Sequence, residues 1–131
     1  MDSIIKSAVI LVVDDEENAR EGLSKILTKE GYKVETAANG KEAVDTIKLH
    51  SFDLVITDMR MPLMDGFELL REIKKMDDNI GVIMITAYGE VESYLEAMNM
   101  GAFEYINKPV RVNELKRVIT KVLEDRQKKA S

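Results

Sequence analysis

Short apolar runs alternate along this chain with longer segments in which apolar residues recur three or four positions apart. The short runs are rich in β-branched residues and predict strands at residues 8–13, 33–37, 53–57, 81–85 and 102–107. The longer segments each carry one apolar stripe and predict helices around residues 19–27, 43–47, 67–73, 91–98 and 115–122. Gly31 and Gly101 follow the first and fourth helical patterns, where a left-handed residue commonly ends a helix.

The strict alternation of strand and helix predicts the fold class. Parallel strands that follow one another are joined by right-handed crossovers, and each crossover helix buries its apolar stripe against the sheet. Nearly continuous apolar runs at 8–13, 53–57 and 81–85 fit strands that are covered on both faces. We therefore predict a doubly wound α/β domain, (βα)5, with a five-stranded parallel sheet. The pattern leaves the order of the strands open.

Composition narrows the class of protein further. With 131 residues, 45% of them hydrophobic, the chain has the size of one domain that buries a core without disulfides, and it has no cysteine. A net charge of −5 argues against a nucleic-acid-binding surface, which needs clustered Lys and Arg. The apolar run near the amino end is too short, and too acidic at both ends, for a signal peptide or a membrane span. We expect a soluble cytoplasmic protein that binds neither nucleic acid nor membrane.

Polar residues that can carry chemistry follow the predicted strands. Asp14 and Asp15 come after the first strand, Asp58 after the third, Thr86 after the fourth and Lys108 after the fifth. Because parallel strands end at one edge of the sheet, these side chains should converge there, where open α/β sheets bind their ligands. Carboxylates that face one another are tolerated when a hard divalent cation lies among them, and Mg²⁺ prefers such oxygen ligands. This pattern predicts a Mg²⁺ site with the aspartate pair as ligands and the lysine as a further compensating charge.

Each of these residues also has a purely structural explanation. Carboxylates at the start of a helix cap free N–H groups and complement the helix dipole, which is the preferred explanation for Glu16 and Glu17. For the aspartate pair taken alone, capping and metal binding are equally good explanations. Asp58 alone could be a turn residue, Thr86 a helix cap and Lys108 a solvated loop residue. Their joint position at the carboxyl ends of strands favours a site.

Four sequence segments resemble the receiver domain of bacterial two-component response regulators. They are LVVDDEE, DLVITDMRMPLMDGFELL, MITAYG and GAFEYINKPV, and they occur in the family's order and spacing. The resemblance covers essentially the whole chain, so we expect a receiver domain over residues 5–124 and a charged helix end or linker over residues 125–131. It also implies a flavodoxin-like strand order of 2-1-3-4-5.

The resemblance implies a phosphoacceptor and a set of metal ligands. Asp58 would accept a phosphoryl group from a phosphohistidine of a sensor histidine kinase. A carboxylate can attack phosphorus without a general base, so the barrier lies mostly in positioning and in charge on the phosphoryl oxygens. Asp15 would bind Mg²⁺ directly and Asp14 mainly through water, while Asp58 itself and the main-chain carbonyl of Arg60 would supply further ligands.

The same resemblance implies catalytic and switching roles for other residues. Lys108 would stabilise charge on the phosphoryl group and Thr86 would bond one of its oxygens, which completes a catalytic set with Asp58. On phosphorylation, Thr86 would move toward the phosphoryl group and the Tyr105 ring would rotate into the vacated space. A plain aromatic residue that fills the core is the alternative for Tyr105. Pro109 would hold the Lys108–Pro109 peptide bond in the cis form.

The expected output is a change of surface. It would affect the face made by the fourth predicted helix, the fifth strand and the fifth helix, the family's α4-β5-α5 face, where partners or a second copy of the domain dock. Residues 85–109 resemble receivers attached to transcription activators more than stand-alone receivers. An output domain beyond the C-terminus, with transcriptional control, and a stand-alone receiver with a free C-terminus both stay open. Such a domain catalyses its own phosphorylation and dephosphorylation without being an enzyme in the ordinary sense.

Three competing functions share parts of this pattern. A haloacid-dehalogenase-type phosphatase needs a second acid two residues after its nucleophile, where this chain has Arg60. A flavodoxin needs a phosphate-binding loop rich in Ser, Thr and Gly after the first strand, where this chain has DDEEN. A degenerate receiver that acts only as a phosphorylation-independent interaction module would not need the complete set Asp14, Asp15, Asp58, Thr86 and Lys108.

Overall fold

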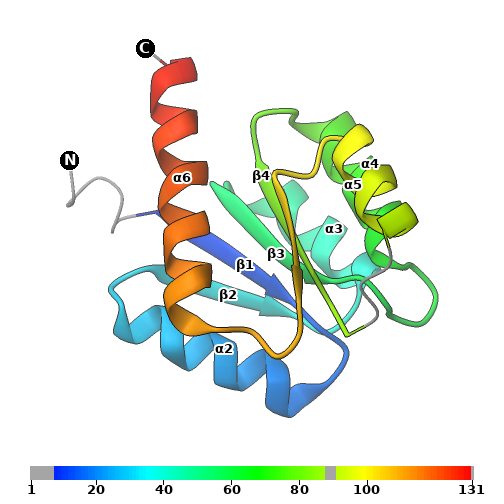
Figure 1. The fold of residues 1–131 in the computed structure, drawn as a ribbon, viewed down its shortest axis with the longest axis horizontal. Coiled ribbons are helices and arrows are strands. Elements are labelled where there is room, and N and C mark those ends of the chain that lie inside the picture. Colours follow the sequence, from blue (N-terminus) through cyan, green and yellow to red (C-terminus); the bar gives the residue numbers. More distant parts are fainter. Residues whose placement is uncertain (1–7, 88–90, 131) are drawn as a thin grey trace.

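The computed structural model describes residues 8–87 and 91–130 and consists of strands and helices in alternation (Figure 1). The strands are β1 (Val9–Val13), β2 (Lys33–Ala37), β3 (Leu54–Asp58), β4 (Gly81–Thr86) and β5 (Glu104–Asn107). The helices are α2 (Glu17–Lys29), α3 (Gly40–Leu49), α4 (Gly66–Met76), α5 (Val91–Asn99) and α6 (Val112–Ala130). The predicted doubly wound α/β class is therefore confirmed.

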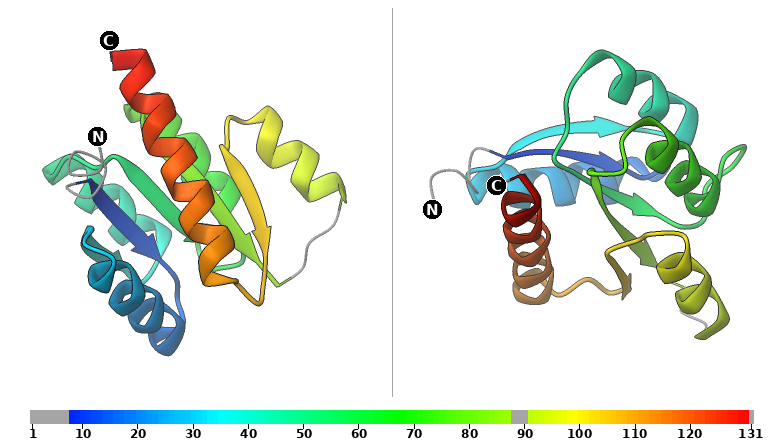
Figure 2. Two further views of the ribbon diagram at one scale, coloured as in Figure 1. Left: turned by 60° about the vertical axis from the view of Figure 1, so that its left-hand side comes forward. Right: turned by 90° about the horizontal axis from the view of Figure 1, so that it is seen from above.

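The five strands form one parallel sheet in the order β2-β1-β3-β4-β5. This is the order that the family resemblance implied, and it is confirmed. The strand arrowheads lie at the end of the molecule opposite to the two chain termini (Figure 2). Since β1 and β3 are hydrogen-bonded neighbours, Asp14 directly after β1 and Asp58 at the end of β3 start from adjacent positions on the carboxyl edge.

Alternate residues of the central strands face two separate helical layers. On one face Ile10, Val12, Leu54 and Ile56 pack with Leu27 of α2 and with Leu115 and Ile119 of α6. On the other face Leu11, Val13, Val55 and Val82 pack with Ala43 of α3, Leu70 of α4 and Ala97 of α5. Each fully buried Leu or Ile contributes roughly 1.5–3 kcal/mol of hydrophobic stabilisation. The two-sided core explains why the predicted central strands are almost continuously apolar.

Local sequence explains where several helices begin and end. Asn39 and Asp65 cap α3 and α4, because their side chains accept hydrogen bonds from the N–H groups of Glu42 and Glu68 at 2.8 and 2.9 Å. Gly31 and Gly101 follow α2 and α5 with φ of 104° and 101°, which confirms the left-handed helix ends expected there.

Arg126 attaches the last turns of α6 to the amino edge of the sheet. Its guanidinium donates to the main-chain carbonyl of Asn79 and pairs with the carboxylate of Asp53 at 3.3 Å. The other Asp53 oxygen accepts from the N–H of Val9 at 2.8 Å. Arg126 lies beyond the expected domain boundary at residue 124, and that boundary stays a prediction.

Among the described residues, no helix is long and apolar enough to cross a membrane.

We expect Arg126→Ala to lower the free energy of unfolding by about 1 kcal/mol, because a partly exposed ion pair and a charge-assisted hydrogen bond are lost. Urea denaturation would measure the change. Arg117→Ala, on an exposed position of the same helix, removes an equal charge without these contacts. Equal losses in the two variants would contradict the attachment.

Candidate functional site

Three carboxylates meet at the carboxyl edge of the sheet. Asp14, Asp15 and Asp58 each offer an oxygen, and these oxygens lie within 4.8 Å of one another. Asp14 is buried, Asp58 is half-buried and Asp15 is exposed, so the cluster opens to solvent on one side. The convergence predicted from the strand ends is therefore present.

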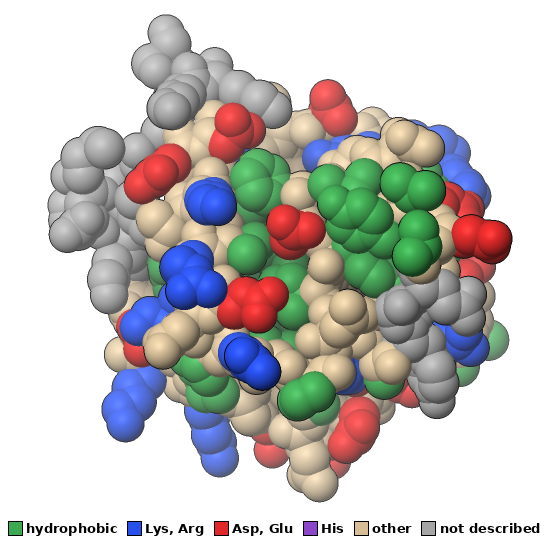
Figure 3. Space-filling model, in the orientation of Figure 1, with side chains coloured by type: hydrophobic (Ala, Val, Ile, Leu, Met, Phe, Trp, Pro, Cys, Tyr) green, Lys and Arg blue, Asp and Glu red, His purple; other side chains and the backbone are tan. Residues whose placement is uncertain are grey.

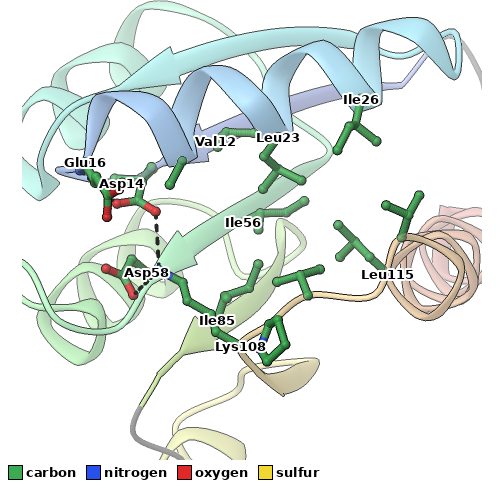
Figure 4. Close-up of a pocket in the computed structure, with 15 residues that line it drawn as sticks. Val12, Asp14, Glu16, Leu23, Ile26, Ile56, Asp58, Ile85, Lys108 and Leu115 are labelled. Carbon is green, nitrogen blue, oxygen red and sulfur yellow. Dashed lines mark hydrogen bonds and ion pairs between the residues drawn. The ribbon is translucent and has the colours of Figure 1, made fainter.

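Lys108 lies between two of these carboxylates. Its Nζ is 3.7 Å from Oδ2 of Asp14 and 3.6 Å from Oδ1 of Asp58, as the dashed lines in Figure 4 mark. One ammonium group offsets only part of the charge of three carboxylates when all three are ionised. An all-oxygen donor set with excess negative charge and an open side fits a hard divalent cation such as Mg²⁺.

The site also perturbs the ionisation of Asp58. Burial raises the pKa of the Asp58 carboxyl above its ordinary value of 3.8, because it disfavours the charged form. Lys108 opposes this shift, and the negative charges of Asp14 and Asp15 add to it. The pKa of Asp58 is raised overall. The ionised Asp58 carboxylate therefore lowers the stability of the folded state when no cation is bound.

This cost predicts that, without metal, Asp58→Asn is more stable than the parent protein at pH 7, because the amide is neutral and of similar size. A group whose pKa is raised by folding destabilises above its folded pKa and stops doing so as pH falls. The advantage of the variant should therefore shrink as pH is lowered toward 3.8. Urea denaturation in EDTA at several pH values would measure it. A variant less stable than the parent at pH 7 would contradict the prediction.

Asp14 is held through two main-chain groups and one side-chain oxygen. Its N–H donates to the carbonyl of Ala37 at 3.2 Å, and its Oδ1 accepts from the N–H of Glu16 at 2.9 Å. Its carbonyl accepts from Nη1 of Arg20 at 2.8 Å. Arg20 was not among the predicted site residues. The available signal was a cation on the helix that follows the acidic pair, a weak signal without the fold.

The structure corrects the capping explanation at Glu16. Glu16 is the N-cap of α2, but its side chain makes no capping hydrogen bond. The N–H of Glu16 instead donates to Oδ1 of Asp14, a contact within the loop between β1 and α2. Glu17 lies in the first turn of α2, where a negative charge complements the helix dipole, as expected.

Thr86 and Lys108 are brought together by the last two strands. Thr86 ends β4 and is fully buried, and its carbonyl accepts from the N–H of Lys108 at 2.7 Å. The Lys108–Pro109 peptide bond is cis. Arg60 follows Asp58 by two residues and is exposed on the loop after β3. The residues predicted from the strand ends therefore occupy one edge of the molecule.

Tyr105 lies inside the molecule and touches the chain next to Asp58. Only 8% of Tyr105 is exposed, and its hydroxyl lies 3.3 Å from the sulfur of Met59. Its ring meets that of Tyr94 edge to face, with centroids 6.0 Å apart. Tyr105 thus bridges Met59, the residue that follows Asp58, and helix α5.

Two apolar features adjoin these residues. A cavity of about 330 Å³ between α2 and α6 opens beside Asp14 and Lys108 and is lined by apolar side chains that include Leu23, Ile26 and Leu115 (Figure 4). On α5, Val91, Tyr94 and Leu95 are exposed by 75%, 40% and 53%. Hydrophobic side chains gather on the side of the space-filling view where Figure 1 places α5 (Figure 3).

The fold and the edge residues define a class: a doubly wound α/β domain whose carboxyl edge joins three aspartates, a buried threonine and a lysine. The family model of the response regulator receiver domain matches residues 10–120. The chain belongs to this family.

Individual relatives agree with this assignment. The chain is 41% identical to sporulation initiation phosphotransferase F of Bacillus subtilis over 114 residues, which span 87% of this chain and 92% of that protein. It is 39% identical to the regulatory protein AtoC of Escherichia coli over 115 residues, but these span 88% of this chain and only 25% of that protein.

Solved structures of receiver domains also match most of this chain. A CheY-like receiver domain protein from Methanospirillum hungatei superposes with a TM-score of 0.90 at 35% identity, covering 94% of this chain and 98% of that one. The beryllofluoride-activated NtrC4 receiver domain dimer gives a TM-score of 0.85 at 36% identity, covering 90% and 98%. CheY in the CheX–CheY–BeF₃–Mg²⁺ complex from Borrelia burgdorferi gives 0.84 at 36% identity, covering 88% of each chain.

Proposed function

We propose that this domain is a cytoplasmic, phosphorylation-activated signalling receiver in which Asp58 accepts a phosphoryl group from a sensor histidine kinase. The observation that best supports this role is that Lys108 contacts both Asp58 and Asp14 at one open edge that also includes Asp15. A phosphoryl group on Asp58 would therefore be met by an ammonium group and lie beside two further carboxylates. Its negative charge needs compensation that the protein supplies only in part.

In the proposed reaction an oxygen of Asp58 attacks phosphorus while the bond between phosphorus and the histidine nitrogen breaks. The imidazole leaves with the electron pair and takes a proton from solvent. Asp58 needs no general base for this attack, since its ionised form is the nucleophile. Lys108 stabilises charge on the phosphoryl oxygens, and the hydroxyl of Thr86 bonds one of them.

A bound Mg²⁺ would neutralise the excess carboxylate charge and the charge on the phosphoryl oxygens. We assign its ligation to Asp14, Asp15, Asp58 and the main-chain carbonyl of Arg60. The oxygens of the three carboxylates lie within 4.8 Å of one another, and the pKa of Asp58 is raised by burial and, to a smaller extent, by the negative charges of Asp14 and Asp15. Both observations support the assignment.

The proposed switch joins Thr86 to Tyr105. Both side chains are buried, and Tyr105 contacts Met59 next to the phosphoacceptor and Tyr94 on α5. Movement of Thr86 toward a phosphoryl group would free space for the Tyr105 ring and change how α5 packs. The affected surface consists of α5, β5 and α6, which are the fourth helix, the fifth strand and the fifth helix along the chain. Val91 and Leu95 are already exposed on it.

We propose three kinds of partner for this receiver. The first is the sensor histidine kinase, and the second is another copy of the domain, docked through the surface of α5, β5 and α6. The third is an output domain beyond the C-terminus, in keeping with the partial coverage of AtoC, and its action would be transcriptional control. Within this proposal the receiver occupies residues 5–124, of which 5–7 and 88–90 lie outside the described residues. Residues 125–131 are proposed as a helix end or linker, and Ser131 also lies outside the described residues.

The test is phosphorylation of the purified chain by acetyl phosphate in Mg²⁺, followed by intact mass. We expect the gain of one phosphoryl group, dependent on Mg²⁺ and abolished by EDTA. Asp58→Asn should remove the gain, whereas Asp45→Asn, at an exposed position of α3, should retain it. A chain that binds Mg²⁺ but gains no phosphoryl group, from acetyl phosphate or from phosphorylated kinase, would instead be a degenerate receiver.

A further inference from the structure

We propose that Arg20 is a positioning residue for the phosphoryl-transfer site, acting through the main chain that joins Asp14 to Asp15. This inference rests on the proposed function. Arg20 lies on α2 and its Nη1 donates to the carbonyl of Asp14 at 2.8 Å. Within the described part of the chain, no ion pair joins Arg20 to a carboxylate. Its contact is therefore with the backbone that presents the ligands and not with the ligands themselves.

The bond to Arg20 completes the immobilisation of Asp14. The N–H of Asp14 is held by Ala37 at the end of β2, and its Oδ1 is held by the N–H of Glu16 at the start of α2. The carbonyl would be free to rotate with its peptide plane if Arg20 did not hold it. With all three groups bound, the remaining oxygen, Oδ2, faces Lys108 at 3.7 Å.

The consequence reaches Asp15 through the planarity of the peptide bond. The carbonyl of Asp14 and the N–H of Asp15 lie in one rigid plane, so a bond that fixes the first also fixes the second. Asp15 is exposed, and no described hydrogen bond or ion pair holds its carboxylate. Its direction into the cluster, where its oxygen lies within 4.8 Å of those of Asp14 and Asp58, therefore depends on its backbone.

Positioning and charge make opposite predictions for the loss of Arg20. If Arg20 acted only as a positive charge near an acidic cluster, its removal would strengthen the binding of a divalent cation. If it positions the loop, its removal should weaken that binding, since residues that orient metal ligands typically contribute 10–100-fold to affinity. The sign of the change separates the two roles.

The experiment is calorimetric titration of MgCl₂ into the metal-free chain and into Arg20→Ala, with the melting temperature of each recorded in EDTA. We expect Arg20→Ala to remain folded and to bind Mg²⁺ about tenfold more weakly. Arg20→Lys, which keeps a charge and a donor, should recover most of the affinity. Lys25→Ala removes a charge from an exposed position on the same helix and should not weaken binding.

Unchanged or tighter Mg²⁺ binding by Arg20→Ala would overturn the inference, as would an equal weakening in Lys25→Ala or no recovery in Arg20→Lys. An Arg20→Ala variant with lower melting temperature but unchanged affinity would make Arg20 merely structural, which also overturns it. Failure of the parent chain to bind Mg²⁺ or to accept a phosphoryl group would instead refute the proposed function. The two failures are therefore distinguishable.

Discussion

Gly66→Ala should destabilise the protein by about 3 kcal/mol and lower its melting temperature by about 10 °C. A Cβ on Gly66 would lie 2.8 Å from Cα of Met59 and 2.9 Å from the carbonyl oxygen of Asp58. Both neighbours are backbone atoms at the end of β3, which cannot rotate away as a side chain can. The N–H of Gly66 also donates to the carbonyl of Met59 at 2.7 Å, which draws the two segments together. Thermal unfolding followed by circular dichroism would measure the loss.

Gly22→Ala is the matched control for this substitution. Gly22 lies within α2, and a Cβ added there meets no atom within 4 Å. Alanine favours the helix over glycine by about 1 kcal/mol, so this variant should be more stable than the parent. Opposite signs in the two glycine variants would show that close packing behind Asp58, and not helix propensity, decides the first result. A Gly66→Ala variant as stable as the parent would contradict the packing argument.

Lys108→Ala should slow phosphorylation of Asp58 by acetyl phosphate about 100-fold, because a preorganised positive charge at the phosphoryl oxygens is lost. The Nζ of Lys108 lies 3.6 Å from Oδ1 of Asp58, within reach of a group attached to that carboxylate. The same substitution removes a cation that competes with Mg²⁺ at Asp14, so binding of Mg²⁺ should not weaken. The rate of phosphoryl gain by intact mass and a calorimetric titration of Mg²⁺ would measure both effects.

Lys116→Ala controls for the loss of a lysine elsewhere. Lys116 lies on α6 and pairs with Glu30, at the end of α2, at 3.2 Å. It makes no described contact with the acidic cluster. Its rate of phosphorylation should equal that of the parent. Parent-like rates in Lys108→Ala would refute the catalytic role of Lys108, and slow rates that accompany weak Mg²⁺ binding would point to a collapsed site.

Predicting the candidate site from the sequence worked best where a rule of topology connects distant residues. The alternation of strands and helices implied a parallel sheet, and in a parallel sheet all residues that follow strands share one edge. Asp14, Asp58 and Lys108 could therefore be placed together from their positions after strands, although they lie far apart in the chain. The structure agrees, with Lys108 within 3.7 Å of both carboxylates.

Other features depend on which elements become neighbours in space, and the sequence does not show these. The bond from Arg20 to the carbonyl of Asp14 spans only six positions, but it depends on how the loop between β1 and α2 turns. The contact between Arg126 and Asp53 joins residues that are 73 positions apart. Gly66 is required only because α4 starts against the last residues of β3. No periodicity or local motif encodes such contacts.

The sequence by itself determined the elements of this protein, its α/β class and the edge at which its chemistry lies, because side-chain periodicity and chain alternation are local properties. The order of the strands followed from neither, since strands pair through main-chain hydrogen bonds that any of them can form, and only resemblance to a family suggested it. Tertiary structure decided the distances, because hydrogen bonds and ion pairs need atoms within a few ångströms. It set the contacts of Lys108 with Asp14 and Asp58 at 3.7 and 3.6 Å, bound Arg20 to the carbonyl of Asp14 and buried Tyr105 beside Met59.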